Sequence, residues 1–357
     1  MRPRPGLIVV VLVPLLLGSA QPNPVLSLGE APLVGFSFSP QLVDAPRAPA
    51  NGLRELLWKL NPDLVRLPIY WSQVAPQPDL LDFSQVDALL ATVAKYDAAR
   101  PSHKTAVVLV VGARNLATPE LHLPDWWASA GPVDLGLVTS SAAYFNYLKA
   151  SFDRYAGSPL LYAWQVENEP LDNTNSGLGD VTIQRNAIAA EVQQLKRIDP
   201  RHPVVVTTYN SSNVALDKEA TSRLSWLYQL LPGPHPAGHP QPALDLGDVL
   251  GLDIYVVTPS TPLAQTGVSQ RIDWKAAALD YWLQRAHGDS KQVWITEMQA
   301  APWDGQDGFT IEDLQESAQA YSRTGVGVVL LWGVESWLGS ADWMAAGRQA
   351  MTTIRAG

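Results

Sequence analysis

The sequence predicts an α/β protein built as a single (β/α)8 TIM barrel, and two observations carry this prediction. Short apolar runs recur along the chain, and each is closed by polar or turn residues and followed by a longer segment of helical period. Several runs, such as 107–111 and 328–331, are continuously apolar, which is typical of parallel strands covered on both faces. Eight strands that alternate with eight helices in a chain of 357 residues indicate this barrel.

An open, doubly wound sheet is the structural alternative for the same alternation of elements. Nucleotide-binding sheets of that kind carry a G-x-G-x-x-G or G-x-x-x-x-G-K turn after the first strand. Neither motif follows the first apolar run of this chain. The closed barrel is therefore the preferred prediction.

The predicted strands are the apolar runs taken in chain order. They cover residues 33–38, 64–67, 105–111, 160–166, 203–207, 249–256, 292–295 and 326–332. In a barrel, residues just past the carboxyl end of each strand face the active site, so polar residues that follow these runs are the candidates for chemistry.

The predicted helices fill the intervals between the strands. Apolar residues at helical spacing indicate helices over 83–96 and 188–195, and Asp199-Pro200 ends the second. Further helices are expected at 51–60, 141–155, 218–231, 272–287, 310–324 and 342–355. Two stretches are expected as long loops: 112–140, after the third strand, and the proline-rich segment 232–242.

Composition excludes several classes of protein. With 46% hydrophobic residues and 13 tryptophans, the chain is neither disordered nor fibrous. A net charge of −9 disfavours nucleic acid as a partner, whereas neutral or cationic ligands are easier to bind. The absence of cysteine excludes disulfides, thiolate metal sites and a cysteine nucleophile. The six histidines show no H-x-H or H-E-x-x-H spacing, so we expect no metal and no other cofactor.

The first twenty residues have the features of a secretory signal peptide. Arg2 and Arg4 precede an apolar run over 7–17, and Gly18-Ser19-Ala20 suits cleavage before Gln21. We expect removal of residues 1–20, a catalytic barrel domain over 21–357, and a secreted or cell-envelope location without stable membrane insertion. An uncleaved amino-terminal anchor is the alternative.

Two carboxylates follow different predicted strands. The fourth strand leads into Glu167-Asn168-Glu169-Pro170, and the seventh leads into Thr296-Glu297. Hydrolysis of a glycosidic bond needs two carboxyl groups at one rim, because one protonates the leaving oxygen while the other attacks the anomeric carbon. This pattern predicts a glycosidase.

The same residues carry a resemblance to a known family. Asn168-Glu169-Pro170 and Glu297 resemble the acid/base and nucleophile motifs of the retaining clan A glycoside hydrolases, the barrel superfamily of cellulases, mannanases and β-galactosidases. Residues 65–74 and 82–87 are similar to the second strand and helix of these enzymes, while 253–255 and 329–332 resemble their sixth and eighth strands. Within this superfamily the sequence most resembles the cellulases, while its second strand–helix unit resembles that of the β-galactosidases. Strand three departs from the pattern, because Gly112-Ala113-Arg114-Asn115 lacks the nearby histidine of many relatives.

The resemblance implies a role for each matching residue. Glu169 would be the general acid and then base, and Glu297 the nucleophile. Asn168 would bind the sugar 2-hydroxyl. Arg66 and Tyr255 would together hold Glu297 ionised and oriented. Trp332 would form the floor under the sugar ring.

Several candidates have a second interpretation. Glu167 lies two residues from Glu169 and so nominally on the same strand face, which makes it a rival for the acid. Glu335 is either a sugar contact or a structural ion partner, and Arg66 can serve as a purely structural cation. Loop tryptophans are candidates for sugar-stacking subsites, with core packing as the alternative for any one of them; they are Trp71, Trp126, Trp127, Trp303, Trp337 and Trp343.

Together these features predict an exported retaining β-glycosidase that hydrolyses a β-linked oligo- or polysaccharide through a covalent glycosyl-enzyme. A non-catalytic carbohydrate-binding barrel is the alternative from another class, and a transglycosylase that uses the same carboxylates is the alternative enzyme. The spacing of motifs specifies neither the sugar, nor endo or exo action, nor the oligomeric state, because these depend on loop shapes.

Overall fold

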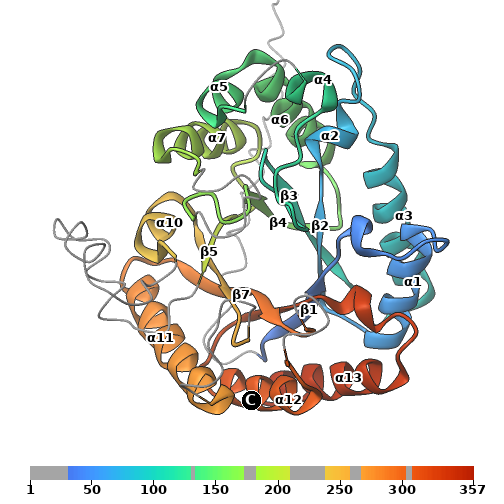
Figure 1. Cartoon of the computed structure of the whole chain (residues 1–357), viewed down its shortest axis with the longest axis vertical. Helices are drawn as coiled ribbons and strands as arrows, with labels where there is room; N and C mark the ends of the chain where they lie inside the picture. Colours follow the sequence, from blue (N-terminus) through green and yellow to red (C-terminus); the bar gives the residue numbers. More distant parts are fainter. Residues whose placement is uncertain (1–30, 130–132, 173–181, 210–237, 258–266, 303–307) are drawn as a thin grey trace, which may run out of the picture.

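The computed structural model describes residues 31–129, 133–172, 182–209, 238–257, 267–302 and 308–357. Eight parallel strands form a closed barrel in sequential order, with helices around the outside (Figure 1). The strands are β1 Leu33–Ser37, β2 Leu64–Pro68, β3 Ala106–Val111, β4 Leu161–Val166, β5 Val204–Tyr209, β6 Val249–Ile254, β7 Gln292–Gln299 and β8 Val328–Trp332. The predicted (β/α)8 barrel is confirmed.

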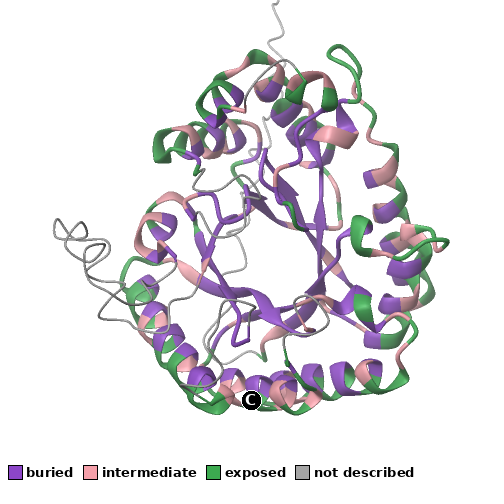
Figure 2. Cartoon of the chain, in the orientation of Figure 1, coloured by how far each residue is buried: buried purple, intermediate pink, exposed green. Residues whose placement is uncertain are grey.

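Strand β1 closes the barrel because it pairs with β2 on one side and with β8 on the other. Val34 lies opposite Val329, and Gly35 lies opposite both Leu64 and Leu330. The strands are buried on both faces (Figure 2). A small apolar cluster fills the barrel interior, and a larger one fills the layer between strands and helices. The continuously apolar runs of the sequence reflect this double burial.

Seven helices of twelve or more residues cover the described barrel. They are α1 Pro49–Leu60, α3 Ser84–Ala99, α6 Ala142–Tyr155, α7 Arg185–Ile198, α11 Val268–Gly288, α12 Ile311–Ser322 and α13 Ala341–Ala356. The side chain of Ser141 caps α6, and Thr310 caps α12 in a reciprocal capping box with Asp313. Shorter elements are η1 Pro40–Leu42, α2 Trp71–Val74, α4 Asp125–Ala128, α5 Leu135–Ser140, α10 Pro240–Leu246 and η2 Val334–Trp337.

Most predicted boundaries shift by a few residues in the structure, and three differences change the interpretation of a segment. The proline-rich segment 232–242 is not wholly a loop, because α10 begins at Pro240, and proline is well suited to the first turn of a helix. Strand β7 extends to Gln299, so Glu297 lies within the strand and not beyond it. The long loop 112–140 contains α4 and α5. The helix predicted at 218–231 lies outside the described residues.

Within the described residues, the structure holds no helix that is both long and apolar enough to span a membrane. The predicted signal segment, residues 1–20, lies outside them.

Candidate active site

Three buried carboxylates come together at the carboxyl ends of the barrel strands. Glu169 follows β4, Asp253 lies in β6 and Glu297 lies in β7. One carboxylate oxygen of each lies within 4.8 Å of the corresponding oxygens of the other two. In the part of the chain that the structure describes, this is the one group of acidic, histidine or cysteine side chains close enough together to hold a metal ion. The structure thus unites the two predicted glutamates and adds an aspartate.

Glu297 is held by the two side chains that were expected to orient it. Arg66, from β2, forms a buried ion pair with one carboxylate oxygen through its Nη2. The hydroxyl of Tyr255 donates to the other oxygen over 2.5 Å. These two contacts fix the position of both carboxylate oxygens, as an attacking nucleophile requires.

Glu169 is surrounded by other carboxyl groups, whereas Glu297 contacts an arginine and a tyrosine hydroxyl. Burial and the negative charges of Glu120, Asp253, Asp172 and Glu297 raise its pKa well above the ordinary value. Its backbone N–H donates to the hydroxyl of Thr207 over 2.9 Å. A raised pKa keeps a carboxyl group protonated, which is the form a general acid requires.

Glu167 is tied to the loop after β3 and takes no part in the carboxylate group. Its carboxylate accepts hydrogen bonds from the backbone N–H groups of Ala113 and Arg114, at 3.0 and 2.6 Å, and from the hydroxyl of Tyr144. A Cβ atom on Gly112 would lie 2.4 Å from this carboxylate, so glycine is needed there. Burial raises the pKa of Glu167 to about 7. Glu167, the alternative candidate for the general acid, is therefore a structural residue.

Asn168 is held from both ends of its amide. Its Oδ1 accepts from Nε2 of Gln165 over 3.0 Å, and its Nδ2 donates to Glu120 over 3.2 Å. Gln165 in turn accepts from Nη1 of Arg66 over 3.0 Å. Hydrogen bonds thus connect the loop that bears Glu169 to the arginine that binds Glu297.

The prediction from sequence missed four polar residues of this site: Gln165, Asp253, Glu120 and Arg114. Asp253 interrupts the apolar strand Val249–Ile254, and a buried acid in such a run was the available signal. One of its oxygens accepts from the hydroxyl of Thr296 over 2.6 Å, and the other has no hydrogen-bond partner among the described residues. Burial and the nearby charge of Glu297 raise its pKa well above the ordinary value.

Trp332 and Glu335 follow the end of β8. The ring of Trp332 is partly exposed, and the guanidinium carbon of Arg66 lies 5.8 Å from its centroid, so the ring borders the site as expected for a sugar platform. The carboxylate of Glu335, in η2, accepts from the backbone N–H of Ser39 and so connects η2 to the start of η1. Burial raises its pKa to about 7. This contact favours the structural interpretation of Glu335.

The prediction of a sugar-stacking role for Trp71 is wrong. Its side chain is fully buried, and its ring packs against Trp126, Trp127, Tyr144 and Tyr147 at centroid distances of 5.2–6.0 Å. It therefore belongs to the core between α2 and α6.

The other tryptophans fall into three groups. Trp126 and Trp127 are half-buried over Trp71, and Nε1 of Trp126 donates to the carbonyl of Ala75 over 2.7 Å, so their role as subsites stays a prediction. Trp337 is fully buried, whereas Trp343 is partly buried beside it. Trp303 lies outside the described residues.

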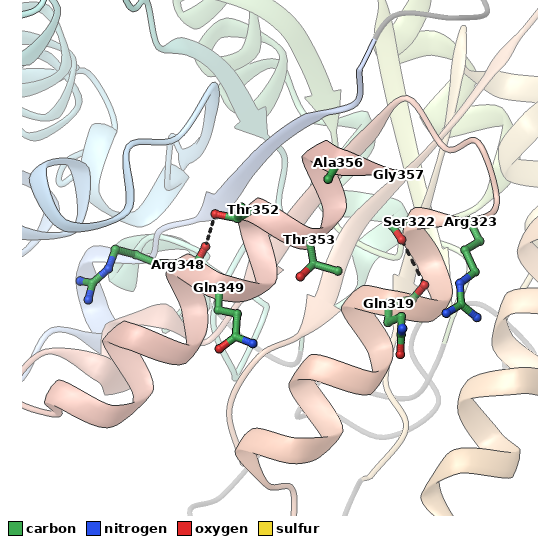
Figure 3. Close-up of a pocket in the computed structure, with 9 residues that line it drawn as sticks. All are labelled: Gln319, Ser322, Arg323, Arg348, Gln349, Thr352, Thr353, Ala356 and Gly357. Carbon is green, nitrogen blue, oxygen red and sulfur yellow. Dashed lines mark hydrogen bonds between the residues drawn. The ribbon is translucent and has the colours of Figure 1, made fainter.

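A groove of about 790 Å³ between α12 and α13 lies away from this site (Figure 3). It sits where α12 ends, at the amino-terminal end of β8, whereas the carboxylates lie at the carboxyl ends of the strands. The hydroxyls of Ser322 and Thr352 each bond to a carbonyl of their own helix. Nothing in this groove points to chemistry.

Comparisons with known proteins agree with the geometry. No protein-family model matches the chain. It is 37% identical over 82 residues to a probable mannan endo-1,4-β-mannosidase F of Emericella nidulans, a match that spans 23% of this chain and 16% of that relative. In fold it is similar to a GH5_18 protein of Streptomyces cattleya solved with GlcNAc, with a TM-score of 0.61 and 17% identity over 91% of this chain and 80% of the other. The chain thus shares the barrel fold of the GH5_18 protein, and a short segment of it is similar in sequence to a much longer mannosidase.

A second solved structure is similar in fold. It is a variant of the Streptomyces cattleya GH5_18 protein in complex with Manβ1-4GlcNAc, with a TM-score of 0.59 and 17% identity over 85% of this chain and 71% of the other. In the present structure the loop after β3 holds the buried ion pair of Arg114 and Glu120, and His122 of the same loop donates its backbone N–H to the carbonyl of Ala113 over 2.9 Å.

Proposed function

We propose that this protein is a retaining β-glycosidase of clan A in which Glu297 is the nucleophile and Glu169 the acid/base. The observation that supports this most directly is the separation of the two groups, each with an oxygen within 4.8 Å of the other's. Retaining glycosidases hold their carboxyl groups about 5–5.5 Å apart, whereas inverting enzymes leave about 6.5–9.5 Å for a water molecule.

The two surroundings suit the two steps of this reaction. In the first step, the ionised Glu297 attacks the anomeric carbon while Glu169 gives its proton to the leaving oxygen, so an ester forms and the glycosidic bond breaks. The charge of Glu297, one of the influences that raise the pKa of Glu169, disappears in the ester. Glu169 then takes a proton from water, which attacks the ester and releases the sugar with its original anomeric configuration.

We propose β-mannosides as the first substrate class to test. The support is the sequence match to a protein described as a probable mannan endo-1,4-β-mannosidase, together with the fold match to a complex with Manβ1-4GlcNAc. A neutral glycan is also compatible with the net charge of −9.

The test uses purified protein and aryl β-mannosides, β-glucosides and β-galactosides, followed by mannan. We expect Glu297→Gln to lower kcat/KM by about 1,000-fold or more and Glu169→Gln by at least about 100-fold. Azide should restore turnover to Glu169→Ala alone, because a small anion can enter the space left by the acid and attack the ester. Glu55→Gln, on the outer helix α1, is the matched control and should keep full activity.

NMR of the first-formed sugar decides the stereochemistry. A retained anomer supports double displacement, and an inverted anomer contradicts it. Sugar binding without turnover would favour the non-catalytic barrel, and predominant transfer to added acceptor sugars would favour the transglycosylase.

We also propose that the protein is exported. The support is the basic and apolar sequence of residues 1–17 followed by small residues at 18–20. Amino-terminal sequencing of protein recovered outside the cytoplasm should start at Gln21, and recovery of the uncleaved chain in membranes would indicate an anchor instead.

A further inference from the structure

We propose that Glu120, held by Arg114, is a positioning residue that sets the amide of Asn168 for contact with the 2-hydroxyl of the substrate. The inference rests on the proposed glycosidase function and assigns a role to the loop after β3, where the resemblance to other enzymes leaves the sugar contacts undefined.

The loop after β3 folds back on itself and fixes Glu120 beside the strand end. Arg114 and Leu121 form an antiparallel bridge. The N–H of Asn115 donates to the carbonyl of Glu120 over 2.8 Å, and the N–H of His122 donates to that of Ala113 over 2.9 Å. Glu120 is only 5% exposed. Its carboxylate therefore has a defined position relative to the barrel.

Arg114 anchors this carboxylate to both ends of the acid/base loop. Its Nη2 lies 2.6 Å from Oε2 of Glu120, and the whole side chain is buried. Its Nη1 donates to the carbonyl of Asp172 over 2.5 Å, and its backbone N–H donates to Glu167 over 2.6 Å. The carbonyl of Arg114 also accepts from the N–H of Asn168 over 3.1 Å. Hydrogen bonds thus tie the ion pair to residues 167, 168 and 172.

The second oxygen of Glu120 determines which way the amide of Asn168 faces. Oε1 accepts from Nδ2 of Asn168, while Gln165 donates to Oδ1 on the opposite side. Reversing the amide would set Oδ1 of Asn168 against a carboxylate and its Nδ2 against another amide donor. Nδ2 carries two hydrogens, and Glu120 accepts one of them, so the other is available for a substrate hydroxyl.

The same contacts connect Glu297 to the loop that bears Glu169. A chain of hydrogen bonds runs through six buried side chains in the order Glu297, Arg66, Gln165, Asn168, Glu120 and Arg114. Asn168 lies in the middle of this chain and Glu120 is its only acidic neighbour there. A substitution at Glu120 is therefore expected to affect the substrate through the orientation of the Asn168 amide.

Glutamine cannot replace Glu120 without breaking one of these bonds. The two carboxylate oxygens accept from two donors, Arg114 and Asn168, whereas a glutamine amide offers one acceptor and one donor group. Glu120→Gln should pair its oxygen with Arg114 and turn its own NH2 group toward Asn168. The amide of Asn168 would then lose its preferred orientation while the bulk of the side chain is preserved.

The test compares an aryl β-glycoside with its 2-deoxy analogue. We expect Glu120→Gln to lower kcat/KM by about 10- to 100-fold on the parent glycoside and by less than about 3-fold on the 2-deoxy compound, as Asn168→Ala should. A double-mutant cycle on the parent glycoside is the second readout. Adding Glu120→Gln to Asn168→Ala should have little further effect, because the two changes remove the same contact.

The controls separate positioning from stability. Glu55→Gln breaks the partly exposed Arg47–Glu55 pair and should leave both substrates unaffected. If a lone buried Arg114 prevents folding of Glu120→Gln, the neutral pair Arg114→Gln with Glu120→Gln replaces it. Equal losses on both substrates, or additive losses in the cycle, would overturn the inference and leave the glycosidase intact. A wild-type protein with no turnover of any glycoside would instead overturn the proposed function, and this inference with it.

Discussion

Two glutamates of the same chemistry have opposite surroundings in this site. Glu297 contacts a guanidinium and a phenolic hydroxyl, whereas Glu169 is buried among other carboxylates. Two glutamates in different surroundings are how a glycosidase obtains an acid and a nucleophile from one residue type. At the residue scale, these contacts support the proposed assignment of roles.

The raised pKa of Glu169 predicts the alkaline side of the pH–rate profile. The acid works only when protonated, so kcat/KM should fall as pH rises through this pKa, well above the ordinary carboxyl value of 4.5. Glu169→Ala acting on a dinitrophenyl glycoside, whose leaving group needs no protonation, should lose this alkaline fall. A wild-type profile that already falls near pH 4.5 would contradict the assignment.

Which glutamate of the fourth strand faces the site is also decided at the residue scale. Residues two apart share a face only while the chain is extended. Glu167 and Glu169 both have positive φ, 60° and 42°, so the chain leaves the extended conformation there and the alternation rule no longer applies. Hydrogen bonds accepted by the carboxylate of Glu167 and donated by the N–H of Glu169 hold this loop in a conformation that costs about 1–3 kcal/mol per residue.

At the scale of elements, an aromatic cluster fixes α2 and α6 against the loop after β3. Trp71 stands at the start of α2, between Tyr144 and Tyr147 of α6 and the two tryptophans of the 112–140 segment. The sequence placed Trp71 near a strand end, and nothing local distinguishes a ring that faces sugar from one that faces a neighbouring helix. Packing with segments more than fifty residues away makes it a core residue.

This packing predicts that Trp71→Ala acts on stability and not on substrate affinity. Removal of a fully buried tryptophan should lower the free energy of unfolding by about 3–5 kcal/mol, measured by chemical denaturation. Trp126→Ala, at a half-buried position, should cost clearly less. A Trp71→Ala protein of unchanged stability but raised KM would restore the sugar-stacking interpretation.

At the scale of the whole molecule, closure of the barrel depends on close approach of β1 and β2. A Cβ atom at Gly35 would lie 1.8 Å from the carbonyl oxygen of its register partner Leu64. That contact is far inside van der Waals distance, and both atoms belong to the backbone. Glycine at position 35 is thus a condition for β1 to pair with β2, and this pairing is part of the closed ring.

We therefore expect Gly35→Ala to prevent cooperative folding, because the side chain fits only if the β1–β2 pairing opens. Circular dichroism and thermal unfolding measure this. Gly157→Ala is the matched control, since a Cβ atom there has no neighbour within 4 Å and should leave the melting temperature almost unchanged. A Gly35→Ala protein with normal unfolding would show that closure tolerates a shift of the strand.

The sequence by itself determined the barrel, the order of its strands and the two glutamates, because apolar periodicity and the acid that follows a strand are local patterns along the chain. Only the tertiary structure decided that Glu167 turns away, that Trp71 is core, and that Asp253, Glu120 and Arg114 join the site. Each of these depends on a backbone torsion or on contacts between segments distant in sequence. Such contacts leave no period in the sequence, so the local patterns along the chain could not reveal them.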